Sequence, residues 1–102
     1  MPYKRTKQEQ ELRDMFENNR VRFLLTELDT AATFCDVALA SSDPQKTQRN
    51  IDNARTGYAT AIELARKARF DERSKAEFEQ RLGHLKSLLR NLGQEVEQKH
   101  DQ

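Results

Sequence analysis

The two histidines and the single cysteine are the first side chains to consider for metal binding or nucleophilic chemistry in this sequence. Glu97 and His100 have the Glu-x-x-His spacing that supplies ligands in helical di-iron sites, which need a second such pair and further glutamates. The residue three positions before His84 is Arg81. The pattern therefore predicts no complete metal site and no bound cofactor. A catalytic histidine needs a converging nucleophile or carboxylate, so we interpret His84 as a half-exposed boundary residue.

Cys35 is the only thiol, which excludes an internal disulfide and a cysteine-based metal cluster. A reactive thiol needs exposure and nearby positive charge, whereas Cys35 lies in an apolar row beside Asp36. We therefore expect a buried cysteine that behaves as a small hydrophobic residue. The sequence also contains no glycine-rich phosphate loop and no paired catalytic motif. It predicts a protein that is not an enzyme and has no small-molecule substrate.

A group of cations surrounds the expected connection between a second and a third helix. This candidate basic patch consists of Arg66, Lys67, Arg69, Arg73 and Lys75. Residues 44–70 carry a net charge of +4, although the whole chain carries only +1. The patch could bind phosphates, but cations at the end of a helix also complement its dipole while remaining solvated. Only Phe70 could stack on a base there. We favour the solvated interpretation and do not expect a nucleic-acid partner.

Length and composition favour one small helical domain over residues 1–102, with frayed ends at 1–5 and 99–102. Apolar residues make up 35% of the chain and charged residues 34%, which suits a thin bundle whose helices each keep one face in water. No apolar stretch follows Met1, and no run approaches the ~20 apolar residues of a membrane span. These features predict a cytoplasmic protein that does not enter a membrane.

The segment from about 6 to 40 predicts one long helix with an apolar face that repeats every three or four residues. The members of this face are Val21, Leu25, Leu28, Ala32, Cys35 and Leu39. Leu24, Ala31 and Ala38 widen it. Such a face is sufficient to pack the helix against neighbours on one side.

A second row on the same helix falls almost opposite to the first, at about 100° per residue. Its members are Leu12, Phe16, Phe23, Phe34 and Val37. The row could face a third helix of the same chain, or it could form a surface for a second chain. This sequence leaves both alternatives open.

Two further helices are expected, over residues 44–69 and 72–98. Asp43 followed by Pro44 is a favourable helix start, because aspartate caps free N–H groups and proline fits the first helical position. Gly57 within the second helix suggests close packing against a neighbour. The third helix begins near Asp71 or Ser74. It carries a heptad row made of Phe78, Leu82, Leu85, Leu89, Leu92 and Val96.

These lengths predict an all-α, antiparallel three-helix bundle, and they leave open whether two such bundles form a dimer. The second helix, folded back on the first, would end near Met15 or Phe16. The third helix would then run parallel to the first. In this arrangement Phe16, Phe70 and Phe78 would meet at one end of the bundle.

The run Ala54-x3-Tyr58-x2-Ala61 resembles the second helix of a tetratricopeptide repeat, whose pattern is A-x3-F/Y-x2-A. Residues 54–64 are also similar to the second helix of the microtubule-interacting-and-trafficking domain. The resemblance implies helical-hairpin packing and the binding of peptides or helices. It assigns no catalytic role to any residue.

The favoured interpretation is a small, non-enzymatic helical bundle that acts as a protein–protein interaction or self-association module. Its expected partner is a second copy of the chain or a helix of another protein. The alternative function is that of a nucleic-acid-associated or regulatory protein that uses the basic end of the second helix.

Overall fold

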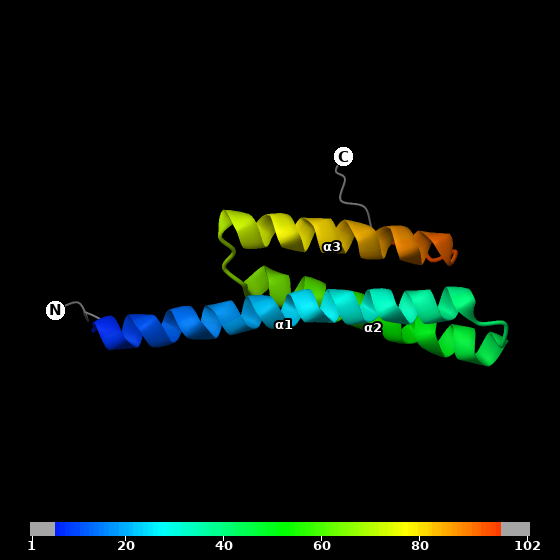
Figure 1. Cartoon of the computed structure of the whole chain (residues 1–102), viewed down its shortest axis with the longest axis horizontal. Helices are drawn as coiled ribbons and strands as arrows, with labels where there is room; N and C mark the ends of the chain where they lie inside the picture. Colours follow the sequence, from blue (N-terminus) through cyan, green and yellow to red (C-terminus); the bar gives the residue numbers. More distant parts are fainter. Residues whose placement is uncertain (1–5, 97–102) are drawn as a thin grey trace.

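The computed structural model describes residues 6–96, which form an all-α three-helix bundle (Figure 1). The helices are α1 (Lys7–Ala40), α2 (Pro44–Lys67) and α3 (Glu72–Asn91). α2 folds back along α1, and α3 returns parallel to α1, so the predicted bundle is confirmed (Figure 1). The ends predicted to fray, 1–5 and 99–102, lie outside the described residues.

The first two helices begin at side chains that satisfy free backbone N–H groups. The Glu9 N–H donates to Oγ1 of Thr6 at 3.0 Å, and the Thr6 N–H donates to Oε1 of Glu9 at 2.9 Å, which completes a capping box. The predicted start of α2 is confirmed, since Oδ1 of Asp43 accepts from the Gln45 N–H at 3.0 Å and Pro44 follows. Local sequence therefore fixes where both helices start.

The sequence predicted that the third helix starts near Asp71 or Ser74, and in the structure α3 starts after Asp71. The Ser74 N–H donates to Oδ1 of Asp71 at 2.7 Å, so Asp71 is the N-cap. This hydrogen bond favours the carboxylate and lowers the pKa of Asp71 below its ordinary value.

α1 and α2 pack as a close antiparallel pair. The buried positions of each helix are separated by three or four residues in turn, as in a coiled coil. On α1 these positions are Val21, Leu24, Leu28, Ala31, Cys35 and Ala38. On α2 the buried positions at this spacing are small or polar: Asn50, Ala54, Gly57 and Ala61. Ile51 is buried beside them. The small side chains let the two helix axes approach closely, as Gly57 predicted.

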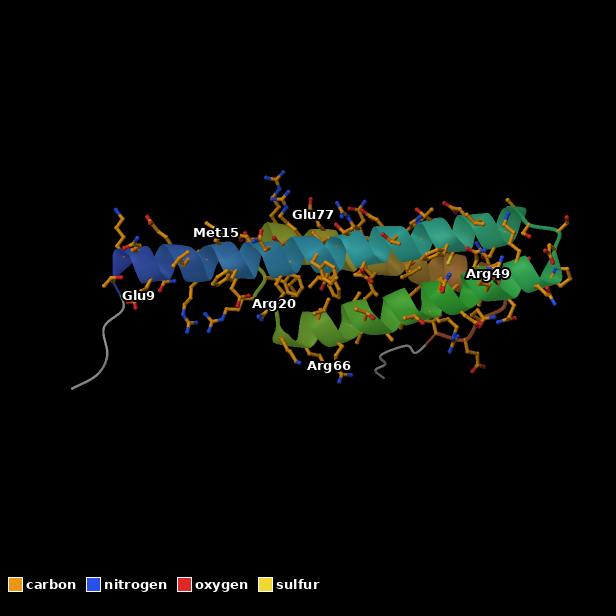
Figure 2. All side chains as sticks on the ribbon, turned by 90° about the horizontal axis from the view of Figure 1, so that it is seen from below. Glu9, Met15, Arg20, Arg49, Arg66 and Glu77 are labelled. Carbon is orange, nitrogen blue, oxygen red and sulfur yellow. The ribbon has the colours of Figure 1, made fainter. Side chains whose placement is uncertain are left out.

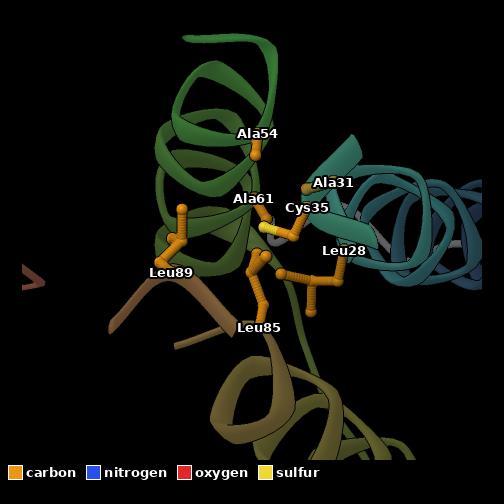
Figure 3. Packing of buried hydrophobic residues seen from close by; sticks show 7 residues of the cluster. All are labelled: Leu28, Ala31, Cys35, Ala54, Ala61, Leu85 and Leu89. Carbon is orange, nitrogen blue, oxygen red and sulfur yellow. The ribbon is translucent and has the colours of Figure 1, made fainter. Parts of the chain in front are cut away.

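α3 completes the core by placing Leu85 and Leu89 against the α1–α2 pair (Figure 3). It packs mainly on α1 and touches α2 much less. Nη1 of Arg81 in α3 lies 3.1 Å from Oδ2 of Asp29 in α1. This ion pair is partly exposed and contributes little to stability, but it shows which levels of the two parallel helices adjoin.

Two predicted helix ends were wrong. α2 ends at Lys67 rather than Arg69, and α3 ends at Asn91 rather than residue 98. Gly93 has a φ of 78°, and the Gln94 N–H donates to the Leu89 carbonyl at 2.9 Å, which closes a Schellman motif. Leu92 and Val96 still pack against the core, but from the chain that follows the helix.

Two expectations for the core of α1 were also wrong. Leu39 is 48% exposed, because Ala38 takes the core position and α3 ends near the level of Leu39. Phe16 is 64% exposed and does not meet the other two phenylalanines. Phe70 and Phe78 do pair, with ring centroids 5.1 Å apart.

The expected end of α2 was displaced by about one turn of α1. Nη1 of Arg20 donates to the Lys67 carbonyl at 3.2 Å, so α2 ends beside Arg20 rather than beside Met15 or Phe16. The Arg69 N–H then donates to Oε1 of Glu17 at 3.4 Å. The first turns of α1 consequently extend beyond the bundle.

Candidate interaction surface

The side of α1 that faces away from α2 and α3 carries exposed apolar side chains. We call the following row the outward face: Leu12, Met15, Phe16, Asn19, Phe23, Thr26, Thr30, Thr33 and Val37. At about 100° per residue these positions share one side of the helix, opposite the buried residues. The outward face contains no charged residue over about 38 Å of helix, at 1.5 Å per residue.

Large apolar residues gather at one end of the outward face. Leu12 is 48% exposed, Met15 54%, Phe16 64% and Phe23 52%. The C-terminal half of the outward face instead carries three threonines and the half-buried Val37. Four large apolar side chains left in water on one helix face are a sign of a protein–protein contact.

The predicted second row is thus divided by the structure. Leu12, Phe16 and Phe23 are exposed and do not face α3, so that alternative was wrong for these three residues. Phe34 is half-buried and packs against the main core, and Val37 is also half-buried. Met15 belongs with the exposed residues, although sequence reasoning did not include it; its position next to Phe16 was the available signal.

Residues 7–16 form an overhang, in which α1 continues past the end of α2 and the start of α3 (Figures 1 and 2). Every residue of the overhang is exposed. Figure 2 shows Glu9 and Met15 on this single helix, with no other helix beside it. An isolated helix of this length is marginally stable in water, so the overhang would gain stability from a covering partner.

The candidate basic patch lies around the connection between α2 and α3, with all five cations exposed. Nη1 of Arg66 lies 3.6 Å from Oε1 of Glu63. Asp71 and Glu72 lie between the cations in the sequence, and Glu77 follows two residues after the last of them. Phe70 packs its ring against Phe78 instead of presenting it to solvent alone. The patch is therefore mixed in charge.

A groove between α2 and α3 is a feature that sequence reasoning missed. It encloses about 600 Å³ and is lined by apolar side chains that include Tyr58, Ile62, Phe78 and Leu82, with Arg66 and Lys86 among its charged residues. The groove exists because α3 leans on α1 and touches α2 little. Helix periodicity gives faces, and no signal in the sequence gives this packing angle.

Cys35 and His84, the two candidates for nucleophilic or metal chemistry among the described residues, are not part of a catalytic or metal-binding cluster. Cys35 is fully buried, and burial together with the charge of Asp36 raises its pKa to about 11. His84 is exposed. Within residues 6–96, no three His, Cys, Asp or Glu side chains gather as a metal site would require. The Glu97–His100 spacing lies outside the described residues.

The fold and this surface define a small all-α three-helix bundle with one apolar, uncharged helix face turned outward. Comparison with family models, with curated proteins and with solved structures finds no match to the chain. The resemblance of residues 54–64 to tetratricopeptide and microtubule-interacting-and-trafficking helices therefore stays a prediction. None of the described helices combines the length and apolar character that crossing a membrane requires.

Proposed function

We propose that this protein is a non-enzymatic helical interaction module that binds another helix through the outward face of α1. The observation that carries the proposal is the exposure of Leu12, Met15, Phe16 and Phe23 on a helix whose opposite face is already buried. α1 therefore has two apolar faces, and its own chain uses one.

The energy of the hydrophobic effect supports this assignment. Fully burying a phenylalanine is worth about 1.5–3 kcal/mol, so covering Phe16 and Phe23 alone would contribute several kcal/mol to binding. Those two residues are 64% and 52% exposed, so most of that gain is still available to a partner. A partner helix suits the long, narrow shape of the surface.

The resemblance of residues 54–64 to helical-hairpin families agrees with this role. The buried free thiol agrees with a location in the cytoplasm, where cysteines stay reduced. The nucleic-acid alternative has weaker support, because acidic residues stand among the cations of the basic patch. The salt dependence of binding distinguishes the two functions. Apolar binding should persist at moderate salt concentrations, whereas the affinity for phosphates falls steeply as salt rises.

Photo-crosslinking tests the proposal directly. A benzophenone side chain replaces Phe23 on the outward face, and in a matched control it replaces Asn53, which is exposed on α2. Irradiation of the protein in its native extract should give defined adducts, with itself or with another protein, from position 23 only. Adducts that are absent, or equal from both positions, would contradict the proposed function.

A further inference from the structure

We infer that the partner of the outward face is a second copy of this chain, held antiparallel by two-fold symmetry. This inference rests on the proposed function and names its partner. In an isologous dimer the same patch is used twice, so the outward face must be complementary to itself. Three features of the face meet this condition.

The first feature is the uneven size of its side chains. Leu12, Phe16 and Phe23 occupy one half of the outward face, and threonines occupy most of the other half. An antiparallel arrangement centred between Leu24 and Leu25 places large residues against small ones. Leu12 then lies opposite the partner's Val37, Phe16 opposite the partner's Thr33, and Phe23 opposite the partner's Thr26. A parallel arrangement would place phenylalanine on phenylalanine and threonine on threonine, which packs less well.

The second feature is the order of charges along the two edges of the outward face. Near the centre one edge carries Arg22 and Asp29, and the other carries Arg20 and Glu27; towards its two ends the first edge also carries Glu11 and Asp36. Two-fold symmetry brings each edge against the same edge of the second copy. With the centre between Leu24 and Leu25, Arg22 falls near the partner's Asp29, and Arg20 falls near the partner's Glu27. At the two ends of the contact Glu11 falls near the partner's Asp36, so the favourable charge pairs lie near the centre only. A parallel dimer would oppose like charges at these positions, which is unfavourable.

Arg22 is the clearest of these charges. It is exposed, and it makes no ion pair within residues 6–96. Asp29 already pairs with Arg81 of its own chain, so the contact would become a cluster of two cations and one carboxylate. Such edge contacts set orientation more than affinity.

The third feature is the overhang. In this register residues 7–16 lie along residues 33–42 of the second copy, so each chain covers the helix that the other leaves unsupported. The contact is about 38 Å long and one helix face wide, roughly 400 Å² of footprint on each chain. That is below the roughly 800 Å² per partner of a standard stable interface, so we expect a reversible dimer with micromolar affinity.

Sedimentation of the full chain over a range of concentrations tests the second copy. The parent should pass from monomer to dimer, and Phe23→Gln should raise the dissociation constant at least about tenfold. Asn53→Gln on α2 is the matched control and should leave the dissociation constant unchanged. A parent that stays monomeric at several hundred micromolar overturns the inference. If position 23 still gives photo-adducts with other proteins, the proposed function stands without the dimer; if it gives none, both fail.

Cysteine crosslinking tests the orientation, in a Cys35→Ala background whose folding is verified by its melting curve. Thr26→Cys lies near the two-fold axis and should form a disulfide with itself, whereas Asn19→Cys should not. A mixture of Asn19→Cys and Thr30→Cys proteins should form the mixed disulfide. In a parallel dimer Asn19→Cys would crosslink with itself as readily as Thr26→Cys, and that result would overturn the antiparallel arrangement while leaving the interaction module intact.

Discussion

Gly57 of α2 lies so close to Ala31 of α1 that a Cβ atom built on Gly57 would be 3.0 Å from the Cβ of Ala31. Nine in ten real Cβ contacts are longer than this, so the two helices approach each other unusually closely at Gly57. The Glu27 carbonyl oxygen would lie 3.5 Å from the same position. Ala31 cannot rotate its methyl group away, because that group is fixed to the backbone.

Replacing Gly57 with alanine should therefore destabilise the protein, although alanine is worth about 1 kcal/mol more than glycine within a helix. Gly83 in α3 provides the matched control, because a Cβ there would meet nothing within 4 Å. Gly83→Ala should raise the free energy of unfolding by roughly 0.5–1 kcal/mol, measured by urea denaturation. An equal gain from Gly57→Ala would show that α1 and α2 are not in close contact.

Replacing Ala61 with leucine should lower the free energy of unfolding by roughly 1–3 kcal/mol, since overpacking forces the helices apart. Ala61 is fully buried in the cluster that contains Leu28 and Leu85 (Figure 3). Ala59→Leu is the control at an exposed position of the same helix, and its effect should stay within about 0.5 kcal/mol. Equal unfolding midpoints for Ala61→Leu and the parent would mean that this face of α2 is not packed.

The buried thiol makes a prediction about alkaline pH. The pKa of Cys35 is raised from 9.0 to about 11 in the folded chain, so the unfolded chain loses this proton first. The free energy of unfolding should then fall as pH rises from about 9 to about 11, by roughly 1–2 kcal/mol. Cys35→Ala should lack this part of the pH dependence in parallel denaturation curves. Identical slopes for the two proteins would show that the thiol is not protected by burial.

Sequence periodicity predicted the three helices and most of the core because both depend on local spacing. Val21, Leu28 and Cys35 recur at helical intervals, and Asp43 with Pro44 marks a helix start by its own chemistry. The end of α3 was misplaced for a related reason. Leu92 and Val96 continue the heptad row, so the pattern favours a longer helix, but Gly93 adopts a positive φ and closes the helix two residues after Asn91.

The candidate surface was only partly predictable. The sequence identified Phe16 and Phe23 as lying on a second apolar face, because helix phase is enough to separate the two faces of α1. It could not show that Phe34 would be drawn into the core while Phe16 stays outside, because that depends on where α2 ends. The α2–α3 groove depends on the angle between two helices, which no local pattern records.

The overhang supplies the last prediction, which concerns amide hydrogen exchange. Residues 11–16 have intrahelical hydrogen bonds, but all of them are exposed, so their amides should exchange much faster than those of residues 24–35 in dilute protein. At concentrations that favour the dimer, the second copy should cover this segment and slow its exchange. Exchange of amides near the middle of α2 should not depend on concentration, and Phe23→Gln should move the concentration dependence in α1 to higher concentrations. Strong protection of residues 11–16 at every concentration would show that the overhang is stable alone, and the need for a covering partner would disappear.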